Sequence, residues 1–386
     1  MRVIVSGAGL RTAHVIEKLR LAMPEIEIVG YCDPQPTHLD RIGADIPAYP
    51  NMEAMLSDAG GELLFVGSPN VFHFDQIAAG LAAGMRIFAE KPVVISYEET
   101  FALAELLSQY EPGRVMVGLV LRYARHMVDL RTALDDGALG KITSLEANEH
   151  IAPYHGAFFM RDWRRKSQNS GGFMLEKCCH DLDLYNMITG SRPARVASFG
   201  GRRSFVPSNA PMRNSEADIF LRKKSVWDSA DDAFHSDGDI IDCQTAILEY
   251  ESGASMAFHT NTNVPDEHRR FCVIGQQGMA EGDFVRGYLR ITRRDGSRYS
   301  EHDYTKGADG QGTNSMSAHY GADELMTRDI AAHLRGEIGV LPVSVYDALT
   351  AGIAALALDQ ARIEGKIIDL SDIWARFDAA RVGAKQ

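Results

Sequence analysis

A lysine, a glutamate and a histidine have the types and the spacing needed to move a proton and a hydride. Lys91 follows the apolar segment Arg86–Ala89 and precedes Pro92, while Glu176 and His180 are four residues apart. That spacing places the last two on one face of a helix if the helix has started by Glu176. A lysine ammonium can stabilise alkoxide character on a hydroxyl oxygen as hydride leaves. A histidine, with an unperturbed pKa of about 6.5, can accept and return the hydroxyl proton.

A glycine turn near the N-terminus predicts a site for the hydride acceptor. The turn follows the apolar run Val3–Val5 and precedes a helical pattern. Such a turn brings backbone amides and a helix dipole to a pyrophosphate. The residues expected to bind a dinucleotide here are Gly7, Gly9, Leu10 and Arg11. Thr12 occupies the third position of the fingerprint, where Gly or Ala is usual, and a glycine turn that binds nothing is the alternative.

Asp33 strengthens the dinucleotide prediction, because it lies 24 positions after Gly9 at the end of the second expected strand. An aspartate there accepts hydrogen bonds from the adenosine ribose hydroxyls. Its charge repels a 2′-phosphate by about 1–4 kcal/mol. No arginine follows directly, so NAD is favoured over NADP. Arg41 weakens this prediction if it folds back toward Asp33.

Strand-like and helical segments alternate over residues 1–122, which predicts a Rossmann-type, doubly wound parallel sheet. Counting Arg86–Ala89 as the fifth strand and Val115–Leu119 as the sixth, we expect six strands. Lys91 then follows the carboxyl end of a strand, where such sheets bind ligands. Five of these six strands can be placed in the sequence, at Val3–Val5, Ile26–Tyr31, Leu63–Val66, Arg86–Ala89 and Val115–Leu119.

Residues 123–386 have a different pattern and predict a second, α+β domain with a mainly antiparallel open sheet. A chain of 386 residues also exceeds the usual size of one hydrophobic core. Residues 206–239 are polar and non-periodic, and we expect a long surface excursion there. The expected strands are Ile142–Glu149, Arg195–Gly200, Gln244–Tyr250, Ser255–Thr260, Arg270–Ile274 and Tyr288–Arg293.

Composition restricts the class of partner. The net charge of −12 and the pI of about 5.5 disfavour nucleic acid and anionic membranes. The sequence has no run of 18 apolar residues and no signal-peptide pattern. Five scattered cysteines fit reduced thiols in a cytoplasm. Cys178-Cys179-His180 lacks the spacing and the second ligand pair of a zinc site, so we expect no metal.

Together these motifs resemble the Gfo/Idh/MocA oxidoreductases, the family of glucose–fructose oxidoreductase and inositol dehydrogenase. The resemblance covers essentially the whole chain and rests on the glycine turn, Glu90-Lys91-Pro92 and residues 171–183. It implies hydride transfer between NAD and a ring hydroxyl or ketone of a sugar, sugar derivative or cyclic polyol. Lys91 would stabilise the substrate oxygen, and His180 would be the acid/base, assisted by Glu176. Most members have aspartate at the position of Glu176, and this carboxylate is free to face the substrate, His180 or neither.

The family likeness also implies further contacts and a homodimer or homotetramer. Near the cofactor it implies Ser68, Pro69, Asn70, His73 and Glu90, and near the substrate Arg122, Tyr154, His155, Arg164 and His319. Several of these predictions have a non-catalytic alternative. His73 and His180 would then cap helices, Lys91 would pair with Glu90 at the surface, and the five substrate contacts would be polar residues of the core or an interface. Asp183 is expected behind the site.

Two other functions stay open. Some relatives resemble this chain but use bound NAD transiently to cleave a glycosidic bond without net redox change. The other alternative is a non-catalytic NAD-binding sensor.

Overall fold

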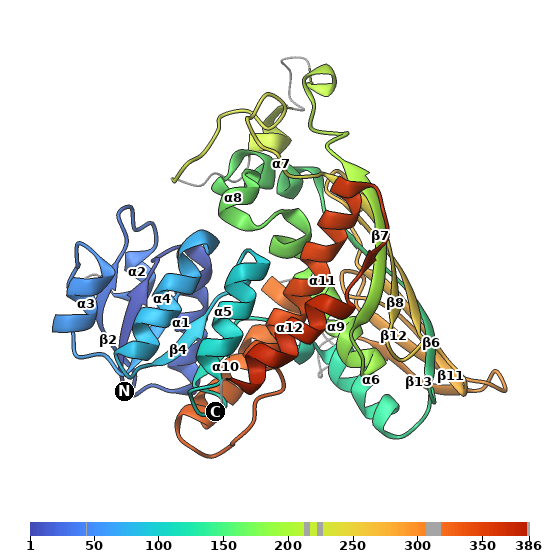
Figure 1. Ribbon diagram of the computed structural model, residues 1–386, viewed down its shortest axis with the longest axis horizontal. Helices are drawn as coiled ribbons and strands as arrows, with labels where there is room; N and C mark the ends of the chain where they lie inside the picture. Colours follow the sequence, from blue (N-terminus) through green and yellow to red (C-terminus); the bar gives the residue numbers. More distant parts are fainter. Residues whose placement is uncertain (44, 212–216, 222–226, 306–317, 384–386) are drawn as a thin grey trace.

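The computed structural model describes residues 1–386 except 44, 212–216, 222–226, 306–317 and 384–386. It confirms an α/β chain with a parallel sheet in the N-terminal part and a mainly antiparallel sheet in the C-terminal part (Figure 1). Within the described residues, no helix combines the length and the apolar character needed to cross a membrane.

The parallel sheet has five strands in the order β2-β1-β3-β4-β5. Our count of six is therefore wrong. Among the described residues between the second and third strands, the chain makes a single isolated bridge, from Tyr31 to Ala48. Pro47 and Pro50 flank Ala48, and proline has no amide hydrogen with which to extend a ladder. The strands are β1 (Arg2–Ser6), β2 (Glu27–Cys32), β3 (Leu63–Val66), β4 (Arg86–Ala89) and β5 (Val115–Val117).

Local signals begin and end the helices between these strands. Asn51 accepts a hydrogen bond from the Ala54 amide, and Ser96 accepts one from the Glu99 amide. The strand order reverses between β1 and β3, and that reversal opens a ligand crevice at the carboxyl ends of the strands. The helices are α1 (Leu10–Ala22), α2 (Leu39–Ile42), α3 (Met52–Asp58), α4 (His73–Ala82) and α5 (Tyr97–Leu107).

The second sheet has nine strands in the order β13-β12-β11-β10-β6-β9-β8-β7-β14, and within it β6 and β9 are parallel. The six strands expected from sequence are present. Three strands were missed. β11 contains two glycines, β13 is highly charged, and β14 has only two residues. The formation of these strands therefore depends on pairing with their neighbours in the sheet. The strands are β6 (Ile142–His150), β7 (Pro193–Gly201), β8 (Cys243–Tyr250), β9 (Ser255–Asn261), β10 (Arg270–Gly275), β11 (Gly278–Asp283), β12 (Tyr288–Arg293), β13 (Arg298–Asp303) and β14 (Ile368–Asp369).

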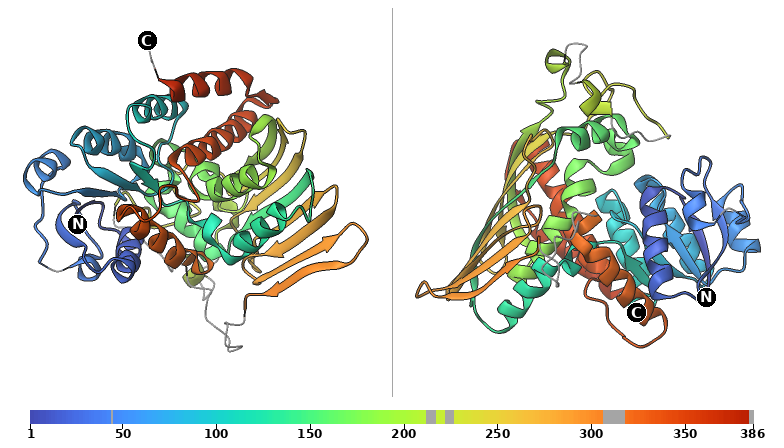
Figure 2. Two further views of the ribbon diagram at one scale, coloured as in Figure 1. Left: turned by 90° about the horizontal axis from the view of Figure 1, so that it is seen from below. Right: turned by 180° about the vertical axis from the view of Figure 1, so that it is seen from behind.

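One face of this sheet carries helices and the other is open (Figure 2). The packed helices are α6 (Arg125–Asp135), α9 (Phe173–Thr189) and α11 (Val345–Glu364). On the open face Phe199 is 78% exposed and Ile247 is 61% exposed. The helix α7 (Pro153–Arg161) was not expected from the sequence.

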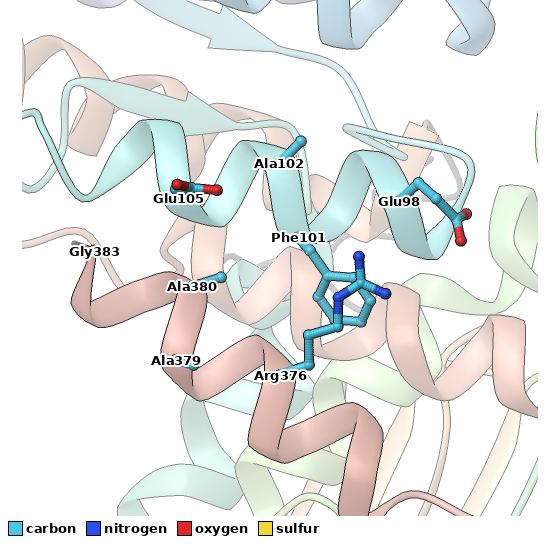
Figure 3. Close-up of a pocket in the computed structure, with 8 residues that line it drawn as sticks. All are labelled: Glu98, Phe101, Ala102, Glu105, Arg376, Ala379, Ala380 and Gly383. Atoms are coloured by element: carbon cyan, nitrogen blue, oxygen red, sulfur yellow. The ribbon is translucent and has the colours of Figure 1, made fainter.

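Two C-terminal helices return to the N-terminal part. The helix α10 (Ala322–Leu334) packs on α1, and α12 (Ser371–Val382) packs on α5. A boundary near residue 122 therefore separates the two sheets but not the helices around them. A surface hollow of about 390 Å³ lies between α5 and α12, where the Arg376 guanidinium stacks over Phe101 (Figure 3). It contains none of the predicted site residues.

The structure describes the expected excursion at residues 206–211, 217–221 and 227–239. Its last part is attached to the short helix η3 (Trp163–Arg165), because Asp228 and Asp237 both pair with Arg165. The Trp227 ring lies 6.0 Å from that of Phe72 and 6.1 Å from that of Trp163. This part of the excursion therefore contacts both halves of the chain.

Candidate active site

The glycine turn meets the end of β3 at close range. Gly7 has φ +86°, and a Cβ at this position would lie 2.4 Å from the Ser68 amide nitrogen. Gly9 precedes α1, and no side chain caps the helix there. The amides of the first turn of α1 are thus available to an anion. Thr12 fits at the third fingerprint position because Gly67 faces it: a Cβ on Gly67 would lie 2.0 Å from Thr12 Oγ1.

Asp33 lies beside this turn. Its Oδ2 accepts a 2.7 Å hydrogen bond from the Ala8 amide, and its Oδ1 accepts one of 2.7 Å from the Gln35 amide. Arg41 Nε lies 2.8 Å from Glu17 Oε1 on α1, so the charge of this arginine is paired there. The residues present therefore fit an NAD pyrophosphate on the turn and a ribose at Asp33.

Arg11 belongs to the turn, but its side chain points into the protein. Its Nε lies 2.9 Å from Glu90 Oε1, and its Nη2 lies 2.8 Å from Asp323 Oδ1. Burial opposes the charge on Arg11, but the two carboxylates hold its pKa above the ordinary value. The guanidinium thus joins α1, the end of β4 and α10. Leu10, the first residue of α1, is 59% exposed.

The residues after β3 make contacts mainly within the protein. Ser68 Oγ donates to Gln76 Oε1 at 2.9 Å. The two ring nitrogens of His73 each lie 2.8 Å from a carbonyl oxygen, those of Pro92 and Ser68. Burial lowers the pKa of His73. This geometry favours the alternative for His73, a structural polar group, while cofactor contact by Ser68 and Pro69 stays a prediction.

Lys91 is held by Glu176. Its Nζ donates to the Glu176 carbonyl at 2.7 Å and lies 3.5 Å from Glu176 Oε1. Glu90, the alternative partner, is taken by Arg11. The ammonium is therefore half-buried and oriented rather than free at the surface.

The Glu176 carboxylate binds three groups. Arg164 Nε lies 2.7 Å from Oε1, and Asn70 Nδ2 lies 2.5 Å from Oε2, in addition to Lys91. Burial opposes its charge, yet these partners keep the pKa of Glu176 below the ordinary value. Among the described residues, its hydrogen-bond and ion-pair partners do not include His180. Glu176 positions the lysine rather than the histidine, so the expected assistance to His180 by Glu176 is not seen in this geometry.

His180 and His319 form a pair of imidazoles with ring centroids 5.6 Å apart, in which His180 is buried and the His319 side chain is 26% exposed. His180 Nδ1 is buried without a partner in the described part of the chain. Burial, together with the charge of Lys91, lowers the pKa of His180 well below its ordinary value. Burial also lowers the pKa of His319 to about 4. Both rings are thus neutral near pH 7, and a neutral imidazole can accept a proton.

A buried network of charged residues next to His180 was not predicted from the sequence. Arg269 lies 2.7 Å from Glu149 Oε2 and 2.6 Å from Asp181 Oδ2, and Lys177 Nζ lies 2.9 Å from Glu149 Oε1. Lys177 and Asp181 adjoin the predicted Glu176 and His180 in sequence. No local signal, however, marks their partners on distant strands.

Other predicted substrate residues are placed differently. Arg122 makes bonds of 2.8 and 2.5 Å to Asp183 and also pairs with Asp347 at 3.1 Å. This agrees with its alternative role, a polar residue at an interface. Tyr154 and His155 lie on α7 with ring centroids 6.1 Å apart. Their contact with substrate stays a prediction.

Two family models match the chain. The model described as an oxidoreductase family with an NAD-binding Rossmann fold matches residues 1–119. The model described as the GFO/IDH/MocA C-terminal domain matches residues 127–281.

Similar proteins include a putative oxidoreductase, YteT, of Bacillus subtilis, which is 25% identical over 67% of this chain and 70% of its own. An inositol 2-dehydrogenase/D-chiro-inositol 3-dehydrogenase of Lactiplantibacillus plantarum is 20% identical over 58% of this chain and 63% of its own. Another four of the curated relatives align over only about half of their length.

Among solved structures, a levoglucosan dehydrogenase in complex with NADH and levoglucosan has a TM-score of 0.74 at 15% identity, covering 96% of this chain and 99% of its own. A scyllo-inositol dehydrogenase of Lactobacillus casei with NAD(H) and scyllo-inositol has a TM-score of 0.70 at 18% identity, with coverage of 96% and 99%. At these identities the structures show a shared fold.

Proposed function

Because the chain belongs to the Gfo/Idh/MocA oxidoreductase family, we propose that it is an NAD-dependent dehydrogenase of a ring hydroxyl in a sugar, sugar derivative or cyclic polyol. The observation that carries the proposal is the position of Lys91, whose Nζ is bonded to the Glu176 carbonyl on α9, one helical turn before the buried His180 ring. The charge of this lysine also lowers the pKa of His180. A fixed cation one helical turn from a neutral imidazole suits the removal of a hydroxyl proton.

NAD bound on the glycine turn supplies the hydride acceptor. The Lys91 ammonium donates a hydrogen bond to the substrate oxygen and stabilises negative charge as it develops. Glu176 holds that ammonium in place, and Arg164 and Asn70 fix Glu176. His180 accepts the hydroxyl proton. In the reverse direction the same groups polarise a ketone and return the proton.

The activity test follows reduced-nicotinamide absorbance with NAD or NADP and a panel of inositols, hexoses, anhydrosugars and glycosides. Substrate-dependent NADH formation that is lost in His180→Ala supports the dehydrogenase. Glycoside cleavage with NAD retained and unconsumed would support the redox-neutral alternative. NAD binding without turnover of any compound would support the sensor.

Asp33 is expected to set the preference for NAD. Asp33→Asn removes the negative charge, so discrimination against NADP should fall by about 1–4 kcal/mol. The measurement is the dissociation constant of NADH and of NADPH from fluorescence titration. Asp40→Asn is the control, because Asp40 is exposed in the same part of the chain. An unchanged ratio in Asp33→Asn would contradict the assignment.

We also propose a cytoplasmic homodimer or homotetramer that buries the open sheet face. Phe199 and Ile247 are exposed on adjacent strands of that face, where Ile247 pairs with Ala197. Exposed apolar groups on a shared face favour association. The double variant Phe199→Glu/Ile247→Glu should lower the mass measured by light scattering. Val340→Glu, at an 86% exposed position outside the sheet, should not. An unchanged mass in the double variant would place the interface elsewhere.

A further inference from the structure

The turn before α10 has an unusual backbone. His319 and Tyr320 both have φ +58°, and Gly321 has φ +78°. Residues other than glycine rarely adopt the left-handed backbone region, and two of them in a row make a strained backbone. Strain of this kind is kept where the surrounding structure enforces it and often accompanies function. Here it places the His319 ring between His180 and Asp323.

Asp323 is fully buried and binds three groups. Its Oδ1 lies 2.8 Å from Arg11 Nη2, and its Oδ2 lies 3.2 Å from both His14 Nε2 and His319 Nδ1. An ionised carboxylate can only accept hydrogen bonds, so Nδ1 of His319 carries the hydrogen. Nε2, on the opposite edge of the ring, then carries a lone pair. The arrangement is a carboxylate-oriented histidine, and the orienting carboxylate acts on His319 rather than on His180.

The two imidazoles are spaced for a shared ligand. The ring centroids lie 5.6 Å apart, a separation at which one oxygen atom can hydrogen-bond to a nitrogen of each ring. His180 Nδ1 also lacks a partner among the described residues. Lys91, Lys177, Arg269 and Arg11 are the cations whose charges act on this pair, and Asp323 is the carboxylate bonded to one of its rings.

We propose that Asp323 is a positioning residue that makes His319 the second imidazole of the active site and the final acceptor of the substrate proton. The inference rests on the proposed function. The substrate carbon loses hydride to the nicotinamide, its oxygen loses the proton, and the C–O bond becomes C=O. The proton passes from His180 to His319 Nε2. The imidazolium forms on His319 rather than on His180, because the Asp323 carboxylate is bonded to the His319 ring.

The kinetic test compares Asp323→Asn, His319→Gln and the double variant. Each should lower kcat by about 10²-fold, with KM changed much less, and the double variant should lose little more. The pH profile of kcat should change alike in all three. Glu324 lies next to Asp323 on α10 and pairs with Lys18 of α1 at the surface, and Glu324→Gln should leave kcat and the profile unchanged. Wild-type kcat and pH profile in folded His319→Gln would overturn the proposal. So would a loss of kcat in the double variant equal to the product of the losses in Asp323→Asn and His319→Gln.

A second measurement does not depend on turnover. Imidazole ¹⁵N spectra of the full-length protein, with His319 assigned from His319→Gln, report its tautomer at neutral pH. We expect the Nδ1–H form in the wild type and in Glu324→Gln, and its loss in Asp323→Asn. An Nε2–H form in the wild type would overturn the positioning role. If the wild type oxidises no compound in the panel, the proposed function fails. The tautomer of His319 is a separate result, and it decides whether Asp323 orients that ring.

Discussion

Lys91→Ala should lower kcat by about 10²–10³-fold, because the variant loses the group that stabilises negative charge on the substrate oxygen. The ammonium lies 2.7 Å from the Glu176 carbonyl and is held by the Glu176 carboxylate, so it is already oriented before substrate binds. Stopped-flow absorbance of NADH formation separates this loss from slow product release.

Lys141→Ala is the matched control, because Lys141 is exposed just before β6. Lys91→Arg keeps the charge but not the shape, and it should recover only part of the loss. Full activity in Lys91→Ala would mean that the catalytic assignment is wrong. A variant that binds NAD and keeps its biological effect without turnover would support the sensor.

Arg269→Met should lower the free energy of unfolding by about 3–5 kcal/mol. The substitution leaves Glu149 and Asp181 buried without their main cation. When one partner of a buried ion pair is removed, the desolvation free energy of the remaining charge is no longer offset. Urea unfolding followed by circular dichroism measures the change.

Arg270→Met is the control, because Arg270 is exposed on the adjacent position and should change stability by less than about 0.5 kcal/mol. Equal stability of the two variants would show that the network beneath His180 contributes nothing to folding. A loss confined to Arg269→Met, with kcat of the folded protein also reduced, would tie the network to the site.

Glu176 is fixed by several partners. Its carboxylate reaches Asn70 and Arg164 while its own carbonyl receives Lys91. The result is a clamp between the end of β4, the β3 turn and α9. His180, one helical turn later, is left without this carboxylate. The carboxylate that orients an imidazole in this site is instead Asp323.

Much of the fold and of the candidate site follows from local sequence. The β1 strand, its glycine turn, the strand ending at Glu90 and the helix carrying Glu176 and His180 all lie where the patterns predict them. These features depend on side-chain periodicity, on caps such as Asn51 and Ser96, and on the φ values open to glycine. Such constraints act within a few residues, and the sequence shows them directly.

The choice of partners depended on tertiary structure alone. Arg11 pairs with Glu90 at a separation of 79 residues, and His14 pairs with Asp323 at a separation of 309. Several carboxylates could satisfy each buried cation, and the packing of α10 on α1 decides which one comes within reach. The same holds for β11 and β13, whose polar sequences become strands only beside their neighbours. Sequence alone indicated which residues can do chemistry, while long-range packing decided which of them meet, since burial makes every unpaired charge costly.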